Sequence, residues 1–159
     1  MSWDWLRRAE GPWIRLAGAD AGTLFDALKH EAHRRGLALR VLRGARMRTV
    51  EGLMDEFAAV CQLPPYFGRN WDALDECLGD LEIAGAEGAV LAILEADQLL
   101  AEAPPEGGRI LFDLLQSAAA AYAGGPQPLP FHTVLQTDVE HLATVEEGLA
   151  ALGVNAKRV

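Results

Sequence analysis

The chain has 159 residues, of which 50% are hydrophobic and 23% charged, and its formal net charge is −9. This length predicts one domain with its own core, and the apolar content argues against disorder. The acidic balance argues against general nucleic-acid binding, which needs surplus cations to displace counterions. No apolar run approaches the ~20 residues of a membrane span, a secretory signal is absent, and Cys61 and Cys77 are too few for a disulfide scaffold. These features predict a soluble protein of a reducing bacterial cytoplasm.

The charges are distributed unevenly along the chain. Residues 1–48 hold ten Lys and Arg against five Asp and Glu, a net of +5, whereas residues 49–159 hold four against eighteen, a net of −14. An acidic body attracts and steers a basic partner. Four arginines lie between residues 40 and 48, and we expect them to pair with this acidic body rather than with a second partner.

Apolar periodicity and turn residues predict strands that alternate with helices. The expected strands are residues 13–17, 37–42, 89–94, 131–136 and 154–159. The expected helices are residues 20–35, 49–63, 70–81, a short one near Asp97, 109–122 and 139–151, with 104–108 as a loop. Thr49 and Asn70 are suitable N-caps, and Gly36 is a helix stop. The alternation implies an α/β layer around a mostly parallel sheet.

The helix expected after Asn70 has an apolar face and an acidic face. The apolar face is formed by Trp71, Leu74, Leu78 and Leu81, and the acidic face by Asp72, Asp75, Glu76 and Asp80. Like charges one helical turn apart repel, so four carboxylates on one face do not help the helix to form. The face is interpreted either as an ordinary solvated surface or as one selected to fit a cationic pocket.

Residues 63–78 read Leu-Pro-x-Tyr-Phe-Gly-x-Asn-x-Asp-Ala-Leu-x-x-Cys-Leu, where x is any residue. This run resembles the signature of the barstar family, the intracellular protein inhibitors of barnase-type ribonucleases. The similarity covers residues 37–136 and is densest in this run, which is far more specific than a lone glycine pattern. Residues 1–36 and 137–159 lie beyond it. We expect both extensions to widen the sheet within a single barstar-like domain of residues 1–159.

The resemblance implies a small, mostly parallel sheet packed with helices, and an inhibitory surface made of the loop and the helix that follows it. By position, Tyr66 would cover the nuclease cleft, and Asp72 and Glu76 would enter the active site. Gly68 would permit a sharp turn into the helix and Asn70 would cap it. These two and Trp71 are expected to be structural. The full expected partner-binding set is Tyr66, Phe67, Arg69, Asp72, Asp75, Glu76, Asp80 and Gln116.

Four positions depart from the family pattern. Glu76 stands where an aspartate is usual, and Gln116 where the late helix of the family carries an acid. Asp75 and Leu81 stand where the family's prototype has aromatic residues. These changes leave the fold prediction intact and bear on which nuclease is the target, because one altered buried charge changes affinity by several kcal/mol.

The sequence therefore predicts a non-enzymatic inhibitor, monomeric when free, of a basic ribonuclease or ribonuclease-domain toxin. We expect no catalytic residue, cofactor, metal, nucleic acid or membrane. Two alternatives stay open: a barstar-fold module with another protein partner, and a hydrolase holding Mg²⁺ on Asp72 and Glu76. His30 and His33 have a metal-compatible spacing but few further ligands nearby. Cys77 lies beside acids, which predicts a raised pKa and low reactivity.

Overall fold

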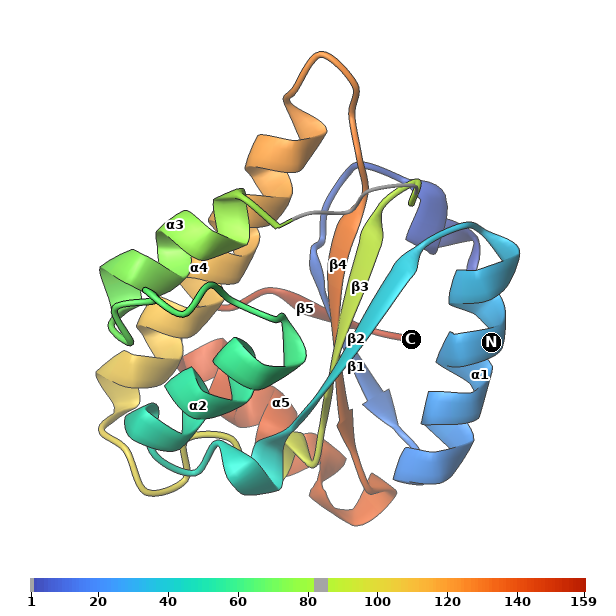
Figure 1. Ribbon diagram of the computed structural model, residues 1–159. Coiled ribbons are helices and arrows are strands. Elements are labelled where there is room, and N and C mark those ends of the chain that lie inside the picture. Colours follow the sequence, from blue (N-terminus) through green and yellow to red (C-terminus); the bar gives the residue numbers. More distant parts are fainter. Residues whose placement is uncertain (1, 82–85) are drawn as a thin grey trace.

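The computed structural model describes residues 2–81 and 86–159, which form a five-stranded parallel sheet with helices on both faces (Figure 1). The sheet order is β2-β3-β4-β1-β5. The strands are β1 (Ile14–Gly18), β2 (Ala38–Arg43), β3 (Ala89–Leu94), β4 (Phe131–Thr137) and β5 (Ala156–Arg158). The predicted α/β class is confirmed.

The described residues also form five α-helices and four short 3₁₀ turns. The helices are α1 (Ala21–Arg34), α2 (Val50–Val60), α3 (Trp71–Gly79), α4 (Pro105–Ala123) and α5 (Leu142–Ala151). The 3₁₀ turns are η1 (Asp4–Arg7), η2 (Gly44–Arg46), η3 (Ala96–Gln98) and η4 (Val139–His141). Within the ranges described, no helix combines the length and the apolar character that crossing a membrane requires.

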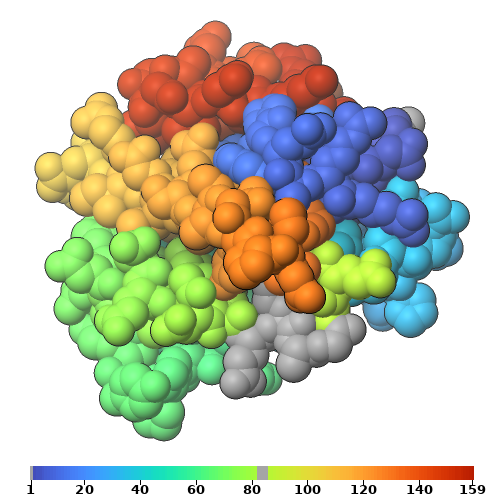
Figure 2. All heavy atoms as spheres, turned by 90° about the horizontal axis from the view of Figure 1, so that it is seen from above, coloured from blue at the N-terminus to red at the C-terminus, as the bar shows by residue number. Residues whose placement is uncertain are grey.

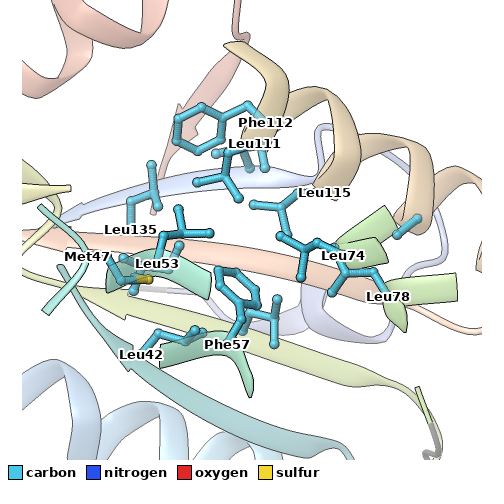
Figure 3. Close-up of a cluster of buried hydrophobic side chains, with 14 of the residues drawn as sticks. Leu42, Met47, Leu53, Phe57, Leu74, Leu78, Leu111, Phe112, Leu115 and Leu135 are labelled. Atoms are coloured by element: carbon cyan, nitrogen blue, oxygen red, sulfur yellow. The ribbon is translucent and has the colours of Figure 1, made fainter. Parts of the chain in front are cut away.

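Helices cover the central strands β3 and β4 on both faces, and every residue of these two strands is buried. On one face, Leu91 and Ile93 pack in a large core with side chains from α2, α3, α4 and α5 (Figures 1 and 3). On the other face, Val90 and Ala92 pack in a smaller core with α1 and η1. This double burial explains why β3 is a continuous apolar run rather than an alternating one.

The two terminal extensions widen the sheet, as predicted. In one extension, β1 pairs with β4 from Ile14 to Gly18. In the other, β5 pairs with β1 over three residues. Both ends of the chain thus add to one edge of the sheet, and the edge strand β2 lies at the opposite side.

Most predicted helix boundaries agree with the structure, but the prediction of one loop was wrong. Residues 104–108 were expected as a loop, whereas α4 begins at Pro105. A proline is compatible with the first helical position, because its missing N–H has no intrahelical partner there. Gly108 lies in this first turn, at a place where α4 packs closely on the C-terminal extension. A Cβ at this position would lie 2.9 Å from Leu152 Cδ1.

Two arginines of the 40–48 segment pair with the acidic part of the chain, as expected. Arg43 donates two hydrogen bonds to the Glu95 carboxylate, at 2.6 and 2.9 Å. Arg48 lies 3.6 Å from the Glu102 carboxylate. These pairs connect the residues on either side of η2 to the segment after β3. Arg40 is half-buried and donates to the Leu39 carbonyl.

Candidate functional site

The inner face of α3 is fixed in the core. Leu74 and Leu78 are fully buried beside Phe57 of α2 and Leu115 of α4 (Figure 3). Trp71 is half-buried against the same core, so the predicted apolar face is confirmed. A helix held in this way presents its outer face in one orientation.

The outer face of α3 and its C-cap carry the four predicted carboxylates. All four are exposed: Asp72, Asp75, Glu76 and Asp80. Among residues 2–81 and 86–159, no Lys or Arg forms an ion pair with any of them. Figure 2 shows the green α2–α3 region and the blue N-terminal segment on opposite sides of the molecule. The acidic face is thus separated from this N-terminal segment.

Asn70 caps α3, as predicted. Its Oδ1 accepts a hydrogen bond of 2.8 Å from the backbone N–H of Ala73. Its Nδ2 donates at 3.4 Å to the carbonyl of Gly68, so the same side chain also holds the preceding loop. An N-cap of this kind contributes about 1 kcal/mol to helix stability.

The two aromatic residues of the loop have opposite environments. Tyr66 is 86% exposed, whereas Phe67 is 8% exposed and packs in the core. The Phe67 N–H donates to the Pro64 carbonyl at 2.9 Å, which closes a tight turn. Phe67 was placed in the expected partner-binding set, but in this structure it anchors the loop and leaves Tyr66 to project outward.

Arg69, also expected in that set, is exposed and pairs with a residue of the chain itself. Its guanidinium forms an ion pair with Asp55 of α2. Arg69 is also the left-handed residue of the turn, with φ of 54°, a role that the sequence had suggested for Gly68. At Gly68 the restriction is space rather than φ, because a Cβ there would lie 3.3 Å from the Cβ of Ala73.

A cavity of about 560 Å³ lies between this loop, α3 and the edge strand β2. Charged side chains line it from two elements, Glu76 and Asp80 from the α3 region and Arg40 from β2. Cys61 and Cys77 also line it. The cavity lets a side chain of a partner enter beside Glu76.

Both cysteines are weak acids. Burial raises the pKa of the Cys61 thiol to about 11. Burial and then the carboxylates of Glu76 and Asp80 raise the pKa of the Cys77 thiol.

We expect iodoacetamide to alkylate the native protein far more slowly at pH 8 than a free thiol of pKa about 8.5, because the thiolate is the nucleophile. Mass spectrometry measures the alkylation rates of the native and the urea-unfolded chain. Equal rates in the two states would contradict the expected protection of the thiols.

Tyr122 of α4 holds the end of α3, a role that the sequence did not suggest. Its hydroxyl donates to the Leu78 carbonyl at 2.7 Å, and its ring stacks on Phe131. Burial raises the pKa of this phenol. Gln116, on the same helix, is half-buried and donates at 3.3 Å to the Phe112 carbonyl of its own helix.

We expect Tyr122→Phe to destabilise the chain by about 1 kcal/mol, because the Leu78 carbonyl loses its donor while the ring remains. Urea unfolding measures the free-energy change. Hydrogen exchange should show the loss concentrated in α3. A uniform loss of protection over the whole sheet would contradict a local role for this hydroxyl.

The described residues contain one group of three metal-ligating side chains whose ligand atoms lie within 4.8 Å of one another. It is Asp138, Glu140 and His141, at and after the end of β4, and all three are exposed. The group includes neither Asp72 nor Glu76. His30 and His33 are exposed on α1 and do not belong to it.

The fold is an α/β sheet that presents a capped acidic helix beside an exposed tyrosine. A family model described as Barstar (barnase inhibitor) matches residues 37–136. The chain therefore belongs to the barstar family. The match runs from the strand β2 to the end of β4 and includes α3 and its loop. No curated protein matches the chain.

Solved structures with a similar fold include chains of ORC proteins. A chain in the structure of Drosophila ORC bound to GC-rich DNA and Cdc6 is 15% identical, with a TM-score of 0.53 over 94% of this chain and 50% of that chain. The Aeropyrum pernix ORC2 protein, in ADPNP-ADP complexes, is 12% identical, with a TM-score of 0.55 over 92% and 41%. This chain thus spans half or less of their length. At these identities the similarity shows the fold alone.

Proposed function

We propose that this chain binds a basic ribonuclease, or the ribonuclease domain of a toxin, and blocks its active site with α3 and the loop before it. The observation that carries the proposal is the set of exposed carboxylates near Tyr66, which pair with no Lys or Arg of the described residues, on a helix whose other face is buried in the core. The family description, barnase inhibitor, supports the same partner class.

The physical basis is mimicry of the RNA phosphate. A ribonuclease holds that phosphate with cationic side chains, and a carboxylate can occupy the same site through charge-assisted hydrogen bonds. The helix is already ordered, so little conformational entropy is lost on binding. The inhibitor itself needs no chemical step.

We propose a smaller contact set than the sequence suggested. Phe67 is buried and the exposed Arg69 is paired with Asp55, so we assign both to support of the loop. The proposed contacts are Tyr66, Asp72, Asp75, Glu76 and Asp80, with Gln116 at the neighbouring helix. Glu76 and Asp80 line the cavity beside β2, which gives an incoming cationic side chain a place to lie.

The proposal is tested by titrating the chain into a purified barnase-type ribonuclease and following RNA cleavage. We expect inhibition that is complete at one inhibitor per enzyme. The association rate should fall steeply as salt rises, because charge attraction accelerates the encounter. Absence of inhibition against all basic ribonucleases tested would contradict the proposal and favour a different protein partner. RNA hydrolysis by the chain alone with Mg²⁺, lost in Asp72→Asn, would instead favour the hydrolase.

A further inference from the structure

A groove separate from the acidic helix lies at the carboxyl ends of the strands, between η3, the start of α4 and α5. Its volume is about 540 Å³. The lining is mainly apolar and includes Leu100, Phe112, Leu135, Val145, Leu149 and Leu152. In parallel α/β sheets the carboxyl ends of the strands are the usual place for a ligand.

The groove exists because the C-terminal extension packs across α4. Its α5 wall, with Val145, Gly148 and Leu149, lies beyond residue 136, where the match to the barstar family ends. Glu76 of α3 and Asp80 at its C-cap line the other cavity, beside β2. The groove is therefore a feature of this chain's extension and is separate from the proposed ribonuclease site.

The rim of the groove is acidic. Asp97 and His141 line it, and Asp138 and Glu140 present their carboxylates within 4.8 Å of the His141 ring nitrogen. Among the described residues that line it, none is a Lys or Arg. A partner that fills this groove is therefore expected to be apolar in the middle and basic at its edge.

An exposed valine lies close to the groove in the chain. Tyr66 and Val139 are the two large hydrophobic residues that the described structure leaves exposed, and Val139 is 70% exposed. We assign Tyr66 to the proposed ribonuclease site. Val139 lies in η4, two residues before His141 of the groove. An exposed apolar side chain outside an apolar groove fits a protein segment better than a small molecule enclosed by the groove.

We propose that this groove docks a basic amphipathic segment of a partner protein. The apolar side chains of the segment enter the groove between α4 and α5 and cover Val139. Its Lys and Arg side chains meet the carboxylates of Asp97, Asp138 and Glu140. Recognition of an amphipathic helix by a groove uses the same combination of apolar anchors and flanking charges.

Gly148→Leu is the variant that tests the proposal without damaging the fold. Gly148 lines the groove, and a Cβ built there has no neighbour within 4 Å, so a leucine side chain has room to occupy the groove. Leucine also has a higher helix propensity than glycine, so α5 should be at least as stable. The matched control is Ala143→Leu, which adds a leucine to an exposed position of α5 that does not line the groove.

The probe is a fluorescent helical peptide of leucine and lysine, about 15 residues long, with a leucine–glutamate peptide as the charge control. Fluorescence anisotropy should show binding of the lysine peptide alone. We expect Gly148→Leu to weaken the affinity for the lysine peptide at least about tenfold. Ala143→Leu and Glu76→Ala should leave this affinity unchanged. Ribonuclease inhibition should be equal in the wild type and Gly148→Leu, so failure of this proposal is distinguishable from failure of the proposed function.

Three outcomes would overturn the proposal. Peptide binding that is unchanged in Gly148→Leu, or is lost in Glu76→Ala, would place the peptide outside the groove. Sedimentation that shows a dimer of the wild type, dissociated by Gly148→Leu, would assign the groove to a second copy of the chain. A short alkylamine that binds as tightly as the peptide would make the groove a small-molecule site.

Discussion

Asp72→Ala and Glu76→Ala are each expected to weaken ribonuclease binding by about 2–5 kcal/mol, a factor of roughly 30 to 5,000 in affinity. Both carboxylates are exposed, and no Lys or Arg of the described residues pairs with either. Their removal should therefore cost the chain little of its own stability. The loss arises in the complex, where a cation of the nuclease would be buried without its partner.

Stopped-flow kinetics with the purified ribonuclease separates two origins of this loss. A carboxylate that enters the active site acts mainly on the dissociation rate, whereas one that only contributes to the field acts on the association rate and its salt dependence. Glu147→Ala is the matched control, because it removes one exposed carboxylate from α5. Similar small effects in all three variants would show that only the net charge matters and would contradict direct entry into the active site.

The parts of the fold that sequence predicts well are those fixed by nearby residues. Asn70 and Thr49 each cap a helix through their own side chains, accepting from Ala73 and Gly52. Gly36 ends α1 with φ of 69°, which glycine adopts at little cost. The acidic and apolar faces of α3 follow from helical periodicity alone.

The parts that sequence does not predict depend on residues far apart in the chain. The sequence pattern does not distinguish adjacent aromatic residues such as Tyr66 and Phe67. Only the packing of the loop decides which one is buried. The Arg69–Asp55 ion pair joins the loop before α3 to α2, and the Tyr122 hydroxyl reaches Leu78 from 44 residues away. The groove likewise requires the C-terminal extension to pack against the start of α4.

The second large effect concerns pH and His132 in β4. This side chain is fully buried, and its ring lies 5.1 Å from that of Trp5. Nε2 lies 2.9 Å from the Arg8 carbonyl oxygen, which can only accept, so Nε2 carries the proton and donates. Nδ1 is buried and has no hydrogen-bond partner among the described residues. A second proton on this ring would therefore lie without an acceptor.

Burial lowers the pKa of His132 to about 4, against 6.5 for an exposed histidine. Between these two values the unfolded chain binds a proton that the folded chain does not. Stability should therefore be complete above pH 6.5 and fall as the pH drops toward 4, by about 3 kcal/mol from this group. Urea unfolding at several pH values in this range measures the slope of the unfolding free energy against pH.

His132→Phe isolates this contribution, because phenylalanine keeps an aromatic ring beside Trp5 and does not titrate. Its stability at neutral pH is expected to be lower, since the Arg8 carbonyl loses a donor. The slope between pH 6.5 and 4 should nevertheless flatten. His30→Gln removes an exposed histidine of α1 and should leave the slope as it is. Arginine partners lower the pKa values of the Glu95 and Glu146 carboxyls, so protonation of these carboxyls also destabilises the fold as the pH falls. This contribution should be equal in the wild type, His132→Phe and His30→Gln. An unchanged slope in His132→Phe would show that protonation of those carboxyls, rather than a buried neutral histidine, sets the acid limit of the fold.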